Sequence, residues 1–457
     1  MHNGGMASGW RSLVERIRSL FSSRRWRIAR NGLVAGLAAG SVSVAYRAAI
    51  ARGTGLAHAA DEAIAHHPLW LLAWLVAALS VATVAWRLVA WEPTASGSGI
   101  PQVAGRLTGR IPLRPVRVLA ARFVGGTGAS LFGLSLGREG PSIHLGAAVG
   151  QLLARPLGAS EEESDHLITS GAAAGLSAAF NAPVSGMLFA MEGLHRSFSP
   201  LIIASAATGA LAADVASTLV FGSRPLLQFT APGDGSGEIP LSLLWVVLPL
   251  GVLTGLVGAL VNRSLLACQS MARLPGPLPV LIAMVAALAC GLLAPRVLGG
   301  GEELIRWAQI GSVGLGSVLA LLLLKFVLTG VSFGSGIPGG IFMPILAIGT
   351  LTGVGYALIA HDLGLSTDLR VALAVCGMAG VLAASVRTPL TSILLTAEMT
   401  GSLGHLLPVA TVVLLAIFTA DALRVPPIYQ ALLERSLGPD VAALVPGASS
   451  PAGGDRP

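Results

Sequence analysis

The chain has 457 residues, of which 53% are hydrophobic and only 11% are charged, and its mean hydropathy is +0.76. A soluble domain carries about 25% charged residues, so this chain has too few to cover a surface that faces water. These values exclude a soluble multidomain enzyme, a disordered protein and a disulfide scaffold. They predict a protein that crosses a membrane several times.

The net charge of +7 is concentrated in the first 30 residues. Basic side chains beside the first apolar run are typical of a cytoplasmic flank, so we expect residues 1–30 to be a basic cytoplasmic tail and no nucleic acid to be bound. The arginine bias favours the cytoplasmic (inner) membrane of a bacterium. The arginines of the tail are Arg11, Arg16, Arg18, Arg24, Arg25, Arg27 and Arg30.

Apolar runs long enough to cross a bilayer recur over residues 31–430. We expect a first half of about 31–221, the polar linker Gly222–Pro240, a second half of about 241–430, and a polar tail over 431–457 without an appended regulatory domain. The predicted spans are Leu33–Ala51, Leu69–Trp91, Val116–Leu153 (broken), Leu167–Glu192, Leu201–Phe221, Leu241–Leu266, Leu278–Leu298, Val313–Phe333, Pro338–Ile359 (broken), Val371–Glu398 and Leu406–Leu423.

The two halves resemble each other. Gly171–Glu192 laid on Gly377–Glu398, at a constant offset of 206 residues, gives seven identities in 22 positions, including Pro183 with Pro389 and Glu192 with Glu398. Upstream, Gly137 matches Gly340 at an offset of 203. Paired, interrupted apolar segments are typical of inverted-repeat transporters, whose site lies near the middle of the membrane.

Three short motifs place glycine and proline just before or at the start of an apolar run: GSGIP at 97–101, GREGP at 137–141 and GGIFMP at 339–344. This pattern suits a helix N-terminus with proline in its first turn. Unpaired N–H groups at such an end attract anions without a full positive charge. Several of these ends together predict a weak anion site that permits rapid passage.

These motifs, together with GAAAGLSAAFNAPVSGMLF at 171–189, TPLTSILLTAEMTG at 388–401 and the Pro-Ile-Tyr at 427–429, resemble the CLC family of chloride channels and chloride/proton exchangers. The resemblance covers roughly Asn31 to Leu437. It implies an all-α fold of two inverted halves with tilted, broken helices. It also implies a homodimer in the lipid bilayer, with one anion pathway per subunit.

The resemblance also implies roles for single residues. Ser98 and Tyr429 match the serine and tyrosine that share the central anion, and Ile341 and Phe342 match the helix start whose backbone N–H groups contact it. Glu139 matches the gating glutamate: an ionised carboxylate occupies an anion site, and protonation releases it. The other candidate anion-binding residues of these motifs are Gly99, Ile100, Gly137, Arg138 and Gly140.

One position departs from the exchangers of the family, which carry a proton-accepting glutamate immediately after the position of Glu192. Here that residue is Gly193. We therefore expect passive or pH-gated chloride conduction, with chloride/proton exchange through another route as the alternative. Glu192 and His195 are the candidate residues of such a proton pathway. The repeat mate Glu398 favours a structural role for Glu192, and a solvated helix end is the simpler interpretation of His195.

Other functions rank lower. Ser98 with Tyr429 argues against the fluoride-exporting branch of the family, although the missing glutamate is shared with it. We expect no enzymatic activity, no metal and no cofactor, with chloride as the transported ion; an intramembrane enzyme built on Glu139, Glu192 and His144 is the competing class. Lys325, the only lysine, is expected to snorkel or to be paired, and His144 to be packed or paired.

Overall fold

The computed structural model describes residues 24–227, 239–309, 313–364 and 369–437, and within them regular structure is helical. The first half contains α2 (Arg24–His66), α3 (Trp70–Trp91), α4 (Ile100–Leu107), α5 (Pro115–Ser130), α6 (Glu139–Ala154), α7 (Glu161–Phe180), α8 (Pro183–Phe189), the π-helix η2 (Ala190–His195) and α9 (Pro200–Phe221). The second half contains α10 (Val247–Cys268), α11 (Leu278–Leu293), α12 (Glu302–Gln309), α13 (Leu315–Gly334), α14 (Phe342–Asp362), α15 (Arg370–Val386), α16 (Pro389–Thr400), α17 (Leu406–Ala422) and α18 (Ile428–Leu437).

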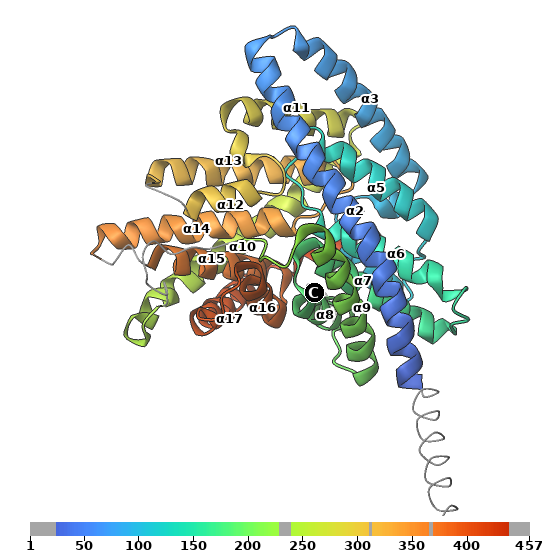
Figure 1. Cartoon of the computed structure of the whole chain (residues 1–457). Helices are drawn as coiled ribbons and strands as arrows, with labels where there is room; N and C mark the ends of the chain where they lie inside the picture. Colours follow the sequence, from blue (N-terminus) through green and yellow to red (C-terminus); the bar gives the residue numbers. More distant parts are fainter. Residues whose placement is uncertain (1–23, 228–238, 310–312, 365–368, 438–457) are drawn as a thin grey trace, which may run out of the picture.

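Many of these helices are long and apolar enough to cross a membrane. Six segments of the described chain meet that condition: α2, α3, α9, α13, α14 and the continuous stretch Leu241–Arg273 around α10. Three shorter apolar helices, α11, α15 and α17, accompany them. This confirms the prediction of an all-α membrane protein. The two halves of the chain lie on either side of the molecule, blue to green on one side and yellow to red on the other (Figure 1).

The packing inside the two halves follows one scheme. In the first half α7 packs against α2, α6 and α9, and in the second half α15 packs against α10, α14 and α17. Gly146 of α6 meets Gly171 of α7 so closely that a Cβ atom on either would overlap the other's carbonyl group, and Gly349 meets Gly377 in the same way. Gly171 aligns with Gly377 at the offset of 206 and Gly146 aligns with Gly349 at the offset of 203, so the predicted repeat is present in the packing.

Two spans that the sequence predicts as continuous are each broken into two helices. Leu167–Glu192 is broken between α7 and α8, where Asn181 adopts a left-handed conformation (φ 54°), and Val371–Glu398 is broken at Arg387 (φ 62°). Each break is followed by a proline in the first turn of the next helix. The short helices α8 and α16 therefore change direction inside the protein, and their N-termini need partners there.

Helices also extend beyond the predicted domain limits. α2 begins at Arg24, seven residues before the expected boundary, because Arg24 pairs with Glu162 and Arg27 Nε lies 2.7 Å from Glu163 Oε1. At the other end α18 continues to Leu437, because Leu432 and Leu433 are buried. The rest of both predicted tails, and most of the linker Gly222–Pro240, lie outside the described residues.

Candidate functional site

The first turns of α6 and α14 meet in the interior. The Gly137 N–H donates to the Gly340 carbonyl and the Gly340 N–H to the Gly137 carbonyl, both at 2.7 Å, in an isolated antiparallel bridge. Glu139 and Phe342 are the first residues of the two helices that follow. Two positive helix ends, one from each half, are thereby directed at one small region.

Glu139 occupies this region. Its side chain is buried, and its carboxylate accepts from its own backbone N–H and from that of Met343 in the first turn of α14. The second carboxylate oxygen, Oε2, has no hydrogen-bond partner among the described residues. The acid thus lies where two helix ends favour negative charge, and it can leave that place only if another anion, or a proton, compensates.

Ser98 and Tyr429 lie beside the same junction, on the side of α4 and α18. Ser98 precedes α4 and lies against Gly140 of α6, while Tyr429 enters from α18. The two hydroxyl groups are buried and lie close to each other, yet neither completes a hydrogen bond within the described protein. Because buried polar atoms are nearly always paired, two unpaired O–H donors this close together indicate a site for an acceptor such as an anion.

Arg122 of α5, which the sequence motifs do not reveal, fixes the Ser98 segment. Its fully buried guanidinium donates to the carbonyl groups of Gly97 (2.8 Å), Thr94 and Ser96 (both 3.2 Å). Its Nε donates to His144 Nδ1 at 2.6 Å, which agrees with the expected pairing of His144. The signal in the sequence is only that Arg122 is one of three arginines, with Arg117 and Arg138, within the run Val116–Leu153.

Aromatic rings surround the inner side of the site. Phe342 stacks on Tyr429 at 6.3 Å between ring centroids and meets the edge of Phe189 at 5.6 Å. Phe189 in turn covers Gly193, because a Cβ atom there would lie 2.7 Å from Phe189 Cε2. The space that a side chain at position 193 needs is therefore filled by this ring.

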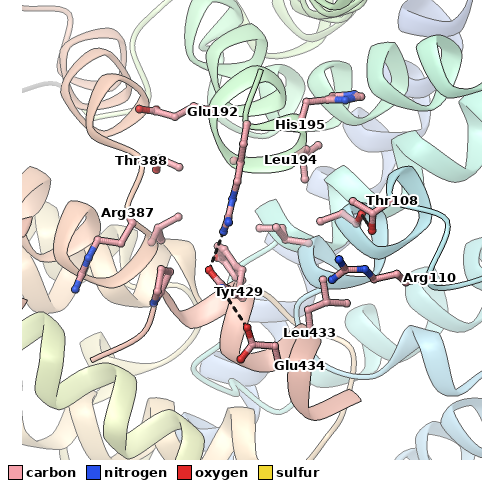
Figure 2. A pocket seen from close by; sticks show the side chains of 17 residues that line it. Thr108, Arg110, Glu192, Leu194, His195, Arg387, Thr388, Tyr429, Leu433 and Glu434 are labelled. Atoms are coloured by element: carbon pink, nitrogen blue, oxygen red, sulfur yellow. Dashed lines mark hydrogen bonds between the residues drawn. The ribbon is translucent and has the colours of Figure 1, made fainter. Parts of the chain in front are cut away.

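Three cavities lie near the junction: the His58, Ser98 and Tyr429 cavities, each called after one of its lining residues. The His58 cavity (≈350 Å³) reaches Glu139 and also exposes Arg138, whose Nη2 lies 2.6 Å from Glu302 Oε1. The Ser98 cavity (≈710 Å³) contains Arg273 and Arg435, and no acid is among its lining residues in the described chain. The Tyr429 cavity (≈560 Å³) reaches Tyr429 and Gly193 (Figure 2).

The cavities open at two ends of the molecule. The Tyr429 cavity is lined by α4 and α18, and Arg106 of α4 is paired at 3.2 Å with Asp165 near the start of α7. The same start of α7 pairs with Arg24, where α2 begins. His58, near the other end of α2, lines the cavity that leads to Glu139. Ser98 thus lines a cavity at one end of the molecule and Glu139 a cavity at the other.

The two candidate proton-pathway residues point to different helices. Glu192 accepts from the N–H groups of Leu390 (3.0 Å) and Thr391 (2.8 Å) at the start of α16, and from the Thr391 hydroxyl (2.7 Å). His195 Nε2 lies 2.6 Å from Thr169 Oγ1 of α7. Both residues lie on the π-helical turn η2, where Glu192 is directed at α16 and His195 at α7.

The repeat mate of Glu192 makes the mirror contact. Glu398 accepts from the N–H groups of Val184 (3.0 Å) and Ser185 (2.8 Å) at the start of α8. Each half thus provides the carboxylate that caps a short helix of the other half. This arrangement agrees with the structural role expected for Glu192 and leaves both of its oxygens occupied.

His195 is also unsuited to carry a proton near neutral pH, because its pKa is too low. Burial, with a smaller contribution from the neighbouring His166, lowers the pKa of His195 to about 4. The imidazole is therefore neutral at pH 7, and it lines the Tyr429 cavity at the end of the molecule that carries α18. Lys325, by contrast, is paired as expected: its Nζ donates to the carbonyl groups of Val297 (2.9 Å) and Gly299 (2.7 Å).

The described residues contain no group of three His, Cys, Asp or Glu side chains that could hold a metal ion. What the site offers is a set of anion-binding donors and one removable carboxylate. The residues of the three motifs and Tyr429 lie around one junction, and their roles in anion binding stay a prediction; they are Ser98, Gly99, Ile100, Gly137, Arg138, Glu139, Gly140, Ile341, Phe342 and Tyr429. An inverted-repeat membrane protein with this site is an anion transporter.

The chain belongs to the CLC family. The family model described as "Voltage gated chloride channel" matches residues 80–421. The H(+)/Cl(-) exchange transporter ClcA of Salmonella paratyphi B is 36% identical over 418 residues, which cover 88% of this chain and 87% of that one. The family, the fold and the transport of chloride that the sequence resemblance implies are thereby confirmed.

Solved structures agree with this assignment. A slow cyanobacterial Cl-/H+ antiporter superposes with a TM-score of 0.82 at 33% identity, covering 90% of this chain and 98% of that chain. A CLC-type fluoride/proton antiporter gives a TM-score of 0.68 at 23% identity, covering 88% and 97%. At that identity the second likeness shows the fold alone.

Proposed function

We propose that this transporter exchanges chloride for protons, with Glu139 as both the gate of the anion pathway and the proton carrier. The observation that carries the proposal is the Glu139 carboxylate between the first turns of α6 and α14, directly beside the unpaired hydroxyls of Ser98 and Tyr429. The relatives named above are exchangers, which supports exchange over the passive conduction expected from Gly193.

The exchange follows from the charge of one side chain. While ionised, Glu139 occupies the anion site and excludes chloride from the path between the cavities. When chloride from the Ser98 cavity binds the hydroxyls of Ser98 and Tyr429 and the N–H groups of Ile341 and Phe342, it displaces the carboxylate. A proton that binds Glu139 removes the remaining repulsion, and return of the neutral side chain carries that proton across.

A proton route without an acid at position 193 is available in the Tyr429 cavity. It starts at the same end of the molecule as the Ser98 cavity, but it is lined by different residues and ends on the opposite side of α18. A space of ≈560 Å³ with both polar and apolar lining has room for several water molecules, which can pass protons. Two separate entries allow chloride and protons to approach Glu139 without sharing a path.

Passive conduction stays the second candidate, and the observation that favours it is Gly193, which the Phe189 ring covers. We further propose that the chain works as a homodimer in the inner membrane of a bacterium. The arginines of the N-terminal region support a cytoplasmic start of α2, and we assign the Tyr429 and Ser98 cavities to the same side. Chloride is the proposed physiological anion because both Ser98 and Tyr429 are present.

The test is flux from liposomes. Purified protein is reconstituted under an outward chloride gradient, voltage is clamped with potassium and valinomycin, and chloride efflux and external pH are recorded together. We expect uphill proton movement that stops in Glu139→Ala while chloride still flows. Chloride flux without uphill proton movement in the unaltered protein would contradict exchange and support passive conduction. No chloride flux from folded protein would overturn both exchange and passive conduction.

A further inference from the structure

We propose that Glu434 of α18 takes up the transported proton from the cytoplasm, in place of an acid at position 193. The inference rests on the proposed exchange and names the group that serves it. Figure 2 shows Glu434 on the α18 side of the Tyr429 cavity, at the opposite side from Glu192 and His195.

Among the lining residues of this cavity in the described chain, two are carboxylic acids. Both carboxylate oxygens of Glu192 accept hydrogen bonds from the start of α16, so protonation of Glu192 would weaken the cap of that helix. In Glu434, Oε1 accepts from Gln430 Nε2 at 2.9 Å, and no other donor of the described residues contacts the carboxylate. Glu434 can therefore gain and lose a proton without breaking a cap.

The position of Glu434 connects the solvent with the anion site. It is partly exposed, and it lies one helical turn from Gln430 and five residues from Tyr429, which is about 7.5 Å along the axis of α18. Gln430 Oε1 also accepts from Arg196 Nη2 at 3.0 Å, so a polar chain of Arg196, Gln430 and Glu434 crosses the cavity just below Tyr429.

α18 lies between the two cavities assigned to the cytoplasmic side, and two neighbouring residues of opposite charge line one cavity each. Glu434 lines the Tyr429 cavity, whereas Arg435 lines the Ser98 cavity and donates to the Leu266 carbonyl of α10 (2.6 Å) and to Gln269 (3.1 Å). An acid faces the cavity assigned to protons, and an arginine faces the cavity assigned to chloride.

The charged groups around Glu434 come from several elements. Arg110 follows α4, Arg196 ends η2, and Arg387 follows α15; Arg387 is paired with Asp421 at 3.0 Å. Glu192 and His195 complete the titratable lining. In the proposed step one proton leaves bulk water for the Glu434 carboxylate, passes through water in the cavity as far as Tyr429 and from there to the Glu139 carboxylate, and leaves Glu434 ionised for the next cycle.

The test compares Glu434→Gln, which keeps the shape but cannot titrate, with Glu434→His, which titrates near neutral pH. Chloride and proton fluxes are measured in liposomes as above. Loss of a positioned proton-transfer group costs about 100-fold or more in rate, so we expect a loss of that order in proton flux in Glu434→Gln, a smaller loss of chloride flux, and retained coupling in Glu434→His. The matched control is Glu161→Gln, an exposed glutamate outside both cavities.

The outcomes are separable. If the unaltered protein moves no protons uphill, the proposed exchange fails, and the role of Glu434 fails with it. If the unaltered protein exchanges and Glu434→Gln exchanges equally well, the role of Glu434 alone is overturned. Equal loss in the Gln and His variants would indicate a structural role and would also overturn it.

Discussion

Gly137 and Gly340 exchange two backbone hydrogen bonds of 2.7 Å across the junction of the two halves. These are the residues that the sequence aligns at an offset of 203, so the repeat-related positions of the two halves touch each other. A Cβ atom on Gly340 would lie 3.0 Å from the Gly137 carbonyl oxygen and 3.0 Å from the Gly140 nitrogen. The contact thus fixes how closely the first turns of α6 and α14, and the anion donors on them, approach each other.

Removing either hydroxyl of the inner site will weaken chloride binding. A hydrogen bond to a charged group contributes about 1.5–3 kcal/mol, so Ser98→Ala and Tyr429→Phe are each expected to raise the chloride Kd by about 10–100-fold. Isothermal titration of detergent-purified protein with chloride measures this. Tyr356→Phe is the control, because that hydroxyl donates to the Val246 carbonyl (2.7 Å) away from the site. Unchanged Kd values in both site variants would contradict the assignment.

Releasing Arg138 from its partner will favour anion entry. Glu302 neutralises Arg138 at the His58 cavity, so Glu302→Gln leaves a positive charge immediately before Glu139. We expect chloride flux at low salt to rise severalfold and the gain to shrink as salt screens it. Glu303→Gln, at the same mouth but 3.7 Å from His58, is the matched control. Equal effects of the two variants would show that total charge, rather than Arg138, is responsible.

Glu192 and Glu398 are expected to behave as a structural pair. Glu192→Gln and Glu398→Gln each replace a carboxylate that caps a helix of the opposite half, at a cost of about 1.5–3 kcal/mol for the charged hydrogen bonds. Both variants should lower the midpoint of thermal unfolding by similar amounts, followed by tryptophan fluorescence. The ratio of proton to chloride flux should stay unchanged. A loss of coupling in Glu192→Gln alone would place that residue in the proton pathway.

Arg122 is expected to act on anion binding without touching the anion. Arg122→Gln removes donors to three carbonyl groups and to His144 and leaves these buried acceptors unpaired, so stability should fall by several kcal/mol. Arg122→Lys keeps the charge and part of the donor set, and it should recover part of the loss. Chloride Kd and thermal midpoint are measured together. A normal Kd in Arg122→Gln would separate the arginine from the position of Ser98.

His195 predicts part of the acid sensitivity. Its pKa is lowered by burial to about 4 in the folded protein, against about 6.5 for the unfolded chain. Its neutral form therefore contributes stability that is complete above pH 6.5 and is lost as the pH falls toward 4. In His195→Gln, the thermal midpoint should fall less between pH 7 and pH 4.5 than in the unaltered protein. His67→Gln, in the exposed turn after α2, should leave the pH profile unaltered.

Much of the site can be predicted from the sequence because its parts are local. Each anion-binding motif is a turn followed by a helix start, and glycine and proline mark such turns at fixed positions. The repeat adds the long-range information that Gly137 and Gly340 are equivalent. Even the role of Glu192 follows from Glu398, since a residue used by both halves serves the shared framework.

The rest depends on contacts that no local pattern encodes. Hydropathy does not detect a single left-handed residue, so the breaks at Asn181 and Arg387 inside apolar runs are missed. Nothing in the sequence distinguishes Arg122 from the other arginines, and only the fold brings three carbonyl groups to its guanidinium. Glu434 lies within the segment expected to be a polar tail, and only the packing of α18 between two cavities gives it a role.

The reciprocal caps have a consequence for biosynthesis. A ribosome delivers the chain from its N-terminus, so α8 enters the bilayer before its capping residue Glu398, which lies 214 residues after Val184, has been made. α16, by contrast, meets a Glu192 that is already in place. The first half therefore completes its fold only when the second half arrives, and a chain truncated between them carries an uncapped helix end that quality-control proteases can recognise.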